Sequence, residues 1–330
     1  MRDNLGPGWR RDFAILCLMN VCWAPVFFFL KDLRAVMSDT GVGLARFGYA
    51  ASFFWLVVWS PRLRQMLHIR MPVSWGERIG SMVIGAALVA PAHLMYFWGL
   101  STSLGTEATL LGASGPIILA LAGAAFLSER LTLGQWIGVF LGFVGVYGVV
   151  TGKWAWIELG STNRSGNLLV LSGFVLETTG TLLAKPLVRR SSGLGYTVWS
   201  FTGNALVFVG LTILWNRPMF TAMPEASDVL KLLYLAVFSA SILWAAWFWV
   251  MERLPVGLMG VSLYCQQIAA ALLGYLVYSD RLAAAAWQGG LLILFSIWLC
   301  TRKSGARREP AREAARGDRD GSSATMGTRR

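Results

Sequence analysis

Ionisable side chains inside otherwise apolar stretches are the residues best placed to do chemistry in this chain. The clearest is Glu177, near the middle of the stretch "FVLETTGTLLAK". An apolar environment disfavours the charged form of a carboxyl, so such a group can take up and release a proton. Two interpretations of Glu177 stay open: a site for a proton or a substrate amine, and a structural hydrogen bond to a neighbouring helix.

Lys185 follows Glu177 by about two helical turns and lies close to the end of the same stretch. We favour an interpretation in which its long side chain extends ("snorkels") to the lipid headgroups. Thr178, Thr181 and Lys185 nevertheless share one helical face, because they are spaced by three and four residues. The alternative is therefore a polar stripe that lines a pathway.

Arg46 and Glu107 each lie about one turn inside an apolar stretch, near the same predicted membrane surface. Snorkelling explains either residue alone, and a carboxylate also suits the positive end of a helix. The hypothesis that we retain is an outer gate formed by Arg46 and Glu107.

The remaining candidates are uncharged at neutral pH or aromatic. We favour a hydrogen-bonded packing role for His93 in "APAHLMYFWG", with pathway lining as the alternative. Trp244 and Trp247 are three residues apart and could stack on a substrate or a cation, or pack between helices. The other predicted pathway residues are Tyr96, Tyr264 and Gln267, the last two of which share a helical face.

The elements that position these residues are predicted to be membrane helices. Of the 330 residues, 55% are hydrophobic and only 14% are charged, whereas a soluble domain carries about a quarter charged residues. A helix that crosses the membrane needs roughly 17–25 mostly apolar residues. Candidate spans fall at about 13–30, 42–59, 79–100, 105–126, 135–151, 167–188, 196–215, 231–250, 256–278 and 283–300. Their apolar runs are continuous and do not alternate, which argues against a β-barrel.

Charge is distributed as expected of a multi-span membrane protein. The net charge is +12, but Lys and Arg lie in short loops and in the C-terminal tail, without the spacing of a zinc-binding or nucleic-acid motif. If the N-terminus is cytoplasmic, most of these cations lie on the cytoplasmic side, which is the usual orientation. We therefore expect both termini in the cytoplasm. The four Cys lie in apolar runs and are interpreted as small hydrophobic residues.

An internal repeat relates the two halves of the chain. A shift of 151 residues aligns "SERL" (Ser128–Leu131) with "SDRL" (Ser279–Leu282), and it aligns the Phe-Trp pair at 97–98 with the pair at 248–249. Each half holds five predicted spans, so the second half starts on the opposite side of the membrane. Such inverted repeats are typical of secondary transporters. We predict an all-α membrane protein with ten transmembrane helices in two inverted five-helix repeats, residues 1–153 and 154–303, followed by a disordered basic tail at 304–330.

Several stretches resemble the EamA-like family of the drug/metabolite transporter superfamily. The residues that carry the resemblance are "GPIILALAGAAFLSERLTLGQWIGVFLGFVGVYGVV" (Gly115–Val150), "LARFGYA" (Leu44–Ala50) and "GNLLVLSGFVLETTGTLLAKPLVRR" (Gly166–Arg190). Gln267 departs from this pattern, because it stands where the family often carries proline. The resemblance implies ten helices, cytoplasmic termini and transport of amino acids, metabolites or small drugs.

Together these observations predict a secondary transporter of the inner membrane that exports a small metabolite or amino acid by alternating access. Exchange for protons is a hypothesis motivated by Glu177, and the export direction follows from the resemblance alone. We expect no cofactor and no metal, a small-molecule substrate and the lipid bilayer as partners, and no nucleic acid; monomer and homodimer both stay open. The alternatives are a receptor or scaffold that acts through the basic tail, and a membrane enzyme.

Overall fold

A computed structural model describes residues 8–102, 111–112, 114–127, 129, 131–155, 164–277 and 283–301. Contacts divide the chain into two units, Met1–Cys300 and Thr301–Arg330, and all the packing reported below lies in the first. The predicted basic tail at 304–330 lies outside the described residues, as does Glu107.

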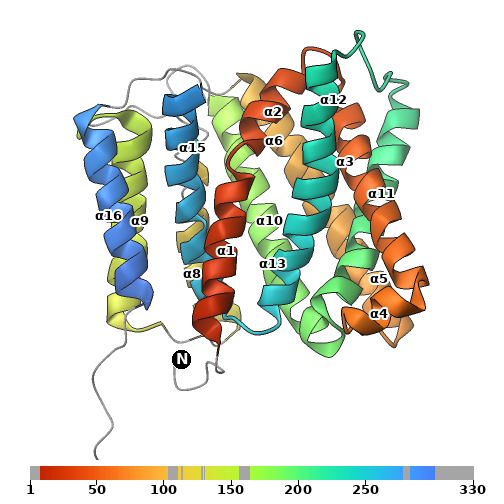
Figure 1. The fold of residues 1–330 in the computed structure, drawn as a ribbon, viewed down its shortest axis with the longest axis horizontal. Coiled ribbons are helices and arrows are strands. Elements are labelled where there is room, and N and C mark those ends of the chain that lie inside the picture. Colours follow the sequence, from red (N-terminus) through yellow and green to blue (C-terminus); the bar gives the residue numbers. More distant parts are fainter. Residues whose placement is uncertain are drawn as a thin grey trace, which may run out of the picture. The chain divides into compact units, whose positions relative to one another are not determined.

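The described residues form helices joined by short loops (Figure 1). Two of these helices, labelled η, are π-helices. The elements are α1 (Trp9–Trp23), α2 (Val26–Leu33), α3 (Asp39–Trp59), α4 (Pro61–Met66), α5 (Trp75–Ile84), η2 (Gly85–Val89), α6 (Ala90–Thr102), α8 (Gly115–Phe126), α9 (Leu133–Thr151), α10 (Arg164–Arg190), α11 (Gly193–Leu214), α12 (Ala226–Leu233), η3 (Tyr234–Leu243), α13 (Trp244–Met251), α14 (Val256–Ser262), α15 (Tyr264–Val277) and α16 (Ala284–Thr301).

Nine helical segments within the described ranges are long and apolar enough to cross a membrane. They are Trp9–Leu33, Asp39–Trp59, Trp75–Ser101, Leu133–Thr151, Arg164–Arg190, Gly193–Leu214, Ala226–Met251, Val256–Val277 and Ala284–Thr301. Each overlaps one of the spans expected from the sequence. The expected span at 105–126 falls partly outside the described residues, and its described part is the shorter apolar helix Gly115–Phe126.

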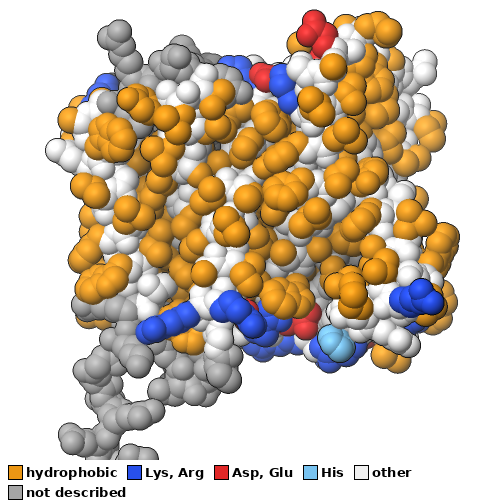
Figure 2. Space-filling view, viewed as in Figure 1, with side chains coloured by type: hydrophobic (Ala, Val, Ile, Leu, Met, Phe, Trp, Pro, Cys, Tyr) orange, Lys and Arg blue, Asp and Glu red, His pale blue; other side chains and the backbone are white. Residues whose placement is uncertain are grey.

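The outer surface of the helices is largely hydrophobic, as expected of a protein surrounded by lipid. Figure 2 shows hydrophobic side chains over the face of the helices, with charged side chains gathered near the helix ends. Large apolar residues such as Trp59, Ile213 and Leu276 are more than 70% exposed. These apolar side chains are not packed inside the protein, and contact with lipid explains why they lie on the surface.

Hydroxyl side chains fix several helix starts. The backbone N–H of Gly41 donates to Ser38 at 3.1 Å, and that of Gly195 donates to Ser192 at 3.1 Å. Thr132 and Gln135 each accept a hydrogen bond from the other's backbone N–H, which forms a capping box at the start of α9. These caps satisfy backbone groups that the first turn of a helix leaves without partners.

Two spans contain π-helical turns, in which the backbone hydrogen bonds reach one residue further than in an α-helix. Residues 85–89 (η2) interrupt the span Trp75–Ser101, and residues 234–243 (η3) interrupt Ala226–Met251. A shift of 151 residues carries 85–89 onto 236–240, inside η3. The two halves thus depart from regular α-helix at equivalent positions.

Interlocking rings and close glycine contacts hold the helices together. α3 packs along α11, where the ring of Phe47 stacks on that of Phe208 at 5.5 Å. α9 and α16 lie side by side in Figure 1. A Cβ atom added at Gly289 would lie 2.3 Å from the carbonyl oxygen of Gly145, so only glycine permits this approach.

Candidate functional site

Tyr96 and Glu177 form the polar contact at the centre of the candidate site. The hydroxyl of Tyr96 on α6 donates a hydrogen bond of 2.5 Å to Oε2 of Glu177 on α10. α10 approaches closely enough because residue 173 is glycine: a Cβ atom there would lie 2.7 Å from the Tyr96 ring. Tyr96 is buried, whereas Glu177 is only partly buried. The carboxyl is therefore held in place by the Tyr96 hydroxyl.

His93 lies one turn before Tyr96 on the same helix and is buried. Its Nδ1 atom lies 2.9 Å from the carbonyl oxygen of Val89, the last residue of η2. A carbonyl oxygen only accepts, so this hydrogen bond requires the proton on Nδ1. The His93 ring also contacts Phe47 at 4.7 Å and Tyr96 at 5.8 Å. These contacts agree with the packing role that we favoured, beside the Glu177–Tyr96 pair.

Arg46 lies inside the protein, on α3. Its residue exposure is 3%, and its guanidinium carbon lies 5.3 Å from the centre of the Phe47 ring. Its charge interacts electrostatically with Glu177. A snorkelling arginine would expose its guanidinium, so the snorkelling interpretation is wrong for Arg46 in this structure. The gate with Glu107 stays a prediction, because Glu107 is outside the described residues.

Lys185 turns into the protein rather than toward lipid headgroups. It is 2% exposed, and its Nζ donates to the carbonyl oxygens of Met251 and, at 2.5 Å, Leu254. The snorkelling interpretation of Lys185 is therefore wrong in this structure. Thr178 and Thr181 lie buried on the same helix. The polar face of α10 thus ends in a lysine that holds the chain just after α13.

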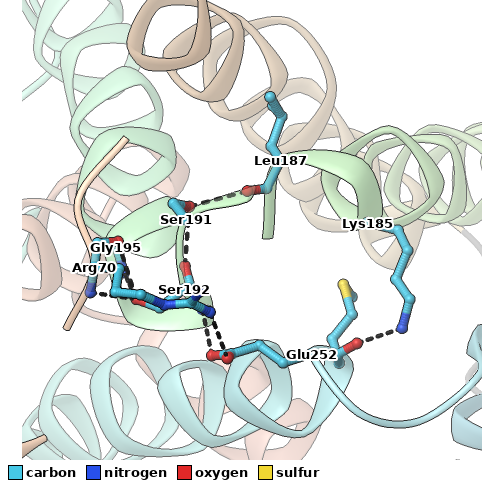
Figure 3. A network of polar contacts seen from close by, with 9 residues as sticks. Arg70, Lys185, Leu187, Ser191, Ser192, Gly195 and Glu252 are labelled. Carbon is cyan, nitrogen blue, oxygen red and sulfur yellow. Dashed lines mark hydrogen bonds and ion pairs between the residues drawn. The ribbon is translucent and has the colours of Figure 1, made fainter. Parts of the chain in front are cut away.

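Lys185 binds the end of α13 at Met251 and the following segment at Leu254. We name the segment Glu252–Gly257 the 252–257 turn; carboxylates make its other contacts. Glu252 accepts a hydrogen bond of 2.7 Å from the backbone N–H of Gly193, and it pairs with Arg70 at 3.6 Å. Figure 3 shows Arg70 at the Glu252 carboxylate, with Lys185 approaching the same stretch of chain from α10. Contacts from several parts of the sequence thus converge on one short turn.

Two further carboxylates complete this arrangement. Glu129 accepts hydrogen bonds from the backbone N–H groups of Val256 at 2.8 Å and Gly257 at 3.0 Å, at the start of α14. Asp12, near the start of α1, accepts a hydrogen bond of 2.6 Å from Nε of Arg253. Sequence reasoning missed both roles. The available signal was the repeated phrase that contains Glu129, which we used only to align the two halves.

Trp244 and Trp247 are buried and pack on the first span. The ring of Trp23 on α1 lies 5.4 Å from Trp244 and 5.9 Å from Trp247. The 151-residue shift aligns His93 with Trp244 and Tyr96 with Trp247. His93 and Tyr96 in the first half, and Trp244 and Trp247 in the second, therefore each follow a π-helical turn and are buried.

Tyr264 and Gln267 are not brought into the same contacts. The hydroxyl of the fully buried Tyr264 donates a hydrogen bond of 2.6 Å to the carbonyl oxygen of Val139 on α9. That hydroxyl is engaged in holding α15 against α9, which is a structural role. Gln267 is partly buried, three residues further along α15.

The described residues contain no group of three or more His, Cys, Asp or Glu side chains that could hold a metal ion. What the arrangement offers is one carboxyl hydrogen-bonded to a tyrosine, a buried guanidinium that interacts with it electrostatically, and aromatic side chains around them. This chemistry suits reversible binding.

Comparisons with known proteins agree with this arrangement. The model of the EamA-like transporter family matches residues 12–151 and 164–302. An uncharacterised transporter of Archaeoglobus fulgidus is 21% identical over 89% of this chain and 99% of its own length. A protein of Streptantibioticus cattleyicolor named a probable terminal-alkyne amino-acid exporter is 26% identical over 69% of this chain and 74% of its own. A crystal structure matches with a TM-score of 0.70 at 18% identity, over 88% of this chain and 97% of its own; at that identity the likeness concerns the fold alone.

Proposed function

Because this chain belongs to the EamA-like transporter family, we propose that it exports a small metabolite or amino acid in exchange for protons. Membership implies a multi-span membrane protein with a small-molecule substrate. The substrate, the direction and the coupling ion are the proposal. Transport proceeds by alternating access, in which a central site opens to one side of the membrane at a time.

The hydrogen bond between Tyr96 and Glu177 is the observation that carries this proposal. It joins α6, in the first half of the chain, to α10, in the second. A partly buried carboxyl at the junction of two halves can be loaded with a proton from one side and unloaded to the other when the halves move. An amine of the cargo competes with the proton for the same carboxylate, and competition of this kind produces exchange.

We further propose two inverted five-helix repeats, residues 1–153 and 154–303. The two segments that the family model matches fall one in each of these halves. The equivalent positions of η2 and η3 support the same relation. An inverted relation gives the protein two arrangements of similar energy, one open to each side, which is what exchange requires.

The proposed orientation places both termini in the cytoplasm and the protein in the inner membrane. The distribution of Lys and Arg supports it. In that orientation the 252–257 turn lies on the cytoplasmic side, because it is bound by Asp12, near the start of the first span. Export is supported by the name of the Streptantibioticus relative, which also makes amino acids the first cargo to test.

The test is amino-acid movement into liposomes that contain the purified protein. With an acidic interior, the wild-type chain should exchange internal protons for external amino acids and accumulate them. Glu177→Gln keeps the size of the side chain but cannot release a proton, so it should not accumulate them. Glu225→Gln changes an exposed carboxyl and serves as the matched control. Wild-type accumulation by Glu177→Gln would contradict the proposal.

A further inference from the structure

Arg46 is a buried cation, and two of its three guanidinium nitrogens form no hydrogen bond with the described part of the chain. Its Nε and Nη1 atoms have no hydrogen-bond partner among the described residues, although the residue is only 3% exposed. A buried charge is costly unless it is paired and hydrogen-bonded. An unsatisfied guanidinium inside a transporter is explained if the cargo supplies its partner while the cargo is bound.

The neighbours of Arg46 leave it open to such a partner. Glu177 interacts electrostatically with Arg46, but no ion pair joins the two within the described part of the chain. Oε2 of Glu177 already accepts from Tyr96. The ring of Phe47 lies 5.3 Å from the Arg46 guanidinium carbon. This cation–π contact does not replace the hydrogen bonds that the N–H groups of Arg46 could donate.

A second unused polar group lies on the helix that packs against α3. Asn204 is fully buried, and neither its Nδ2 nor its Oδ1 has a hydrogen-bond partner in the described residues. It lies between Phe201 and Phe208 on one face of α11. Both of these rings contact Phe47, at 5.7 Å and 5.5 Å. Unused donors are thus found on α3, and an unused donor and acceptor on α11, the two helices whose rings meet at Phe47.

We propose that Arg46 binds a carboxylate group of the cargo. This inference rests on the proposed transport function and adds the chemical class of the cargo. The planar guanidinium matches a carboxylate or a phosphate. A carboxylate is favoured because its single charge balances the single charge of Arg46, whereas a phosphate dianion would place excess negative charge near Glu177.

The two charged groups then have separate tasks. Glu177 binds a proton or the amine of the cargo, and Arg46 anchors the acidic end. An amino acid satisfies both groups, while its carboxamide satisfies only Glu177. The difference between an acid and its carboxamide therefore measures the contribution of Arg46.

The test uses liposomes that contain the full-length protein and are loaded with the twenty common amino acids. The amino acid released fastest serves as cargo. The external amino acid and its carboxamide are then compared as competitors for transport of this cargo. With the wild-type chain, we expect the acid to compete at a concentration about tenfold or more lower than the carboxamide. Arg46→Gln should lose that preference, and Arg46→Lys should keep part of it. Arg64→Gln, which removes an exposed positive charge, should keep all of it.

A structural role for Arg46 makes different predictions. Arg46→Gln would then melt at a lower temperature and impair competition by acid and carboxamide alike. We expect no lower melting temperature without cargo, because no hydrogen-bond partner of Nε or Nη1 is lost. Equal competition by acid and carboxamide in the wild-type chain overturns this inference but leaves the proposed function intact. If the wild-type chain releases no amino acid, both are overturned.

Discussion

The hydroxyl of Tyr96 donates a 2.5 Å hydrogen bond to the carboxyl of Glu177, and this bond connects the two halves of the chain. It fixes the position of the one acidic side chain that lies deep within the predicted spans of the second half. A change in the protonation of Glu177 changes the strength of this bond, since a charged acceptor forms a stronger hydrogen bond than a neutral one. Proton binding is therefore linked to the contact between halves.

Replacement of Tyr96 by phenylalanine should alter proton coupling more than stability. The ring and its packing remain, while the bond to Glu177 is lost at a cost of about 1–3 kcal/mol, because a hydrogen bond to a charged group is lost. We expect slower pH-driven transport and a shifted dependence of the transport rate on pH. Transport assays across a pH series check this.

Tyr264→Phe is the matched control, because it also removes the hydroxyl of a buried tyrosine, but on α15. It should lower the melting temperature without changing the pH dependence of the rate. An identical pH profile for Tyr96→Phe and the wild-type chain would show that the bond to Glu177 has no part in coupling.

Weakening the contacts of the 252–257 turn should expose side chains that the turn keeps buried. Glu129→Ala removes the acceptor of two backbone N–H groups, and we expect the packed turn to lose about 1–3 kcal/mol of stability. Leu254, which is 1% exposed, is a suitable reporter. In a variant without native cysteines, Leu254→Cys should react slowly with a soluble thiol reagent and faster once Glu129→Ala is added. Unchanged reactivity would argue against a role of Glu129 in holding the turn in place.

Two adjacent glycines on α16 should respond differently to the same substitution. Gly289→Ala places a Cβ atom 2.3 Å from the carbonyl oxygen of Gly145, and we expect a destabilisation of about 1–3 kcal/mol. Gly290→Ala meets no atom within 4 Å and should be neutral or slightly stabilising. Thermal unfolding in detergent distinguishes them. Equal melting temperatures would contradict the close approach of α9 and α16.

The inverted repeat predicts opposite sidedness for two aligned arginines. Arg130 and Arg281 occupy equivalent places in the repeated phrases, and both lie outside the described residues. Cysteines at these positions should react with membrane-impermeant reagents from opposite faces, the first from the cytoplasm. Reaction of both from one face would rule out five spans in each half.

The helices could be predicted because each one leaves a local record. A continuous apolar run of sufficient length identified the nine described spans. The side chains of one helical face, such as Thr178 and Thr181, also follow from spacing alone.

Contacts with the backbone of distant segments could not be predicted in this way. Lys185 binds the carbonyl oxygens of Met251 and Leu254, and Glu129 binds the N–H groups of Val256 and Gly257. Every residue carries a backbone carbonyl and all except proline carry an N–H, so the sequence does not indicate which of these groups form the contacts. The same holds for the π-helical turns, whose apolar residues would equally suit an α-helix.

The most direct test of the account measures protons and cargo in the same liposomes. A pH-sensitive dye inside reports protons, and mass spectrometry reports the amino acid that the wild-type chain transports. We predict that addition of external amino acid raises the internal pH of acid-loaded wild-type vesicles as amino acid enters. In Glu177→Gln vesicles the internal pH should stay constant, even if amino acid still exchanges across the membrane. Amino-acid entry into wild-type vesicles without a pH change would contradict proton exchange at Glu177.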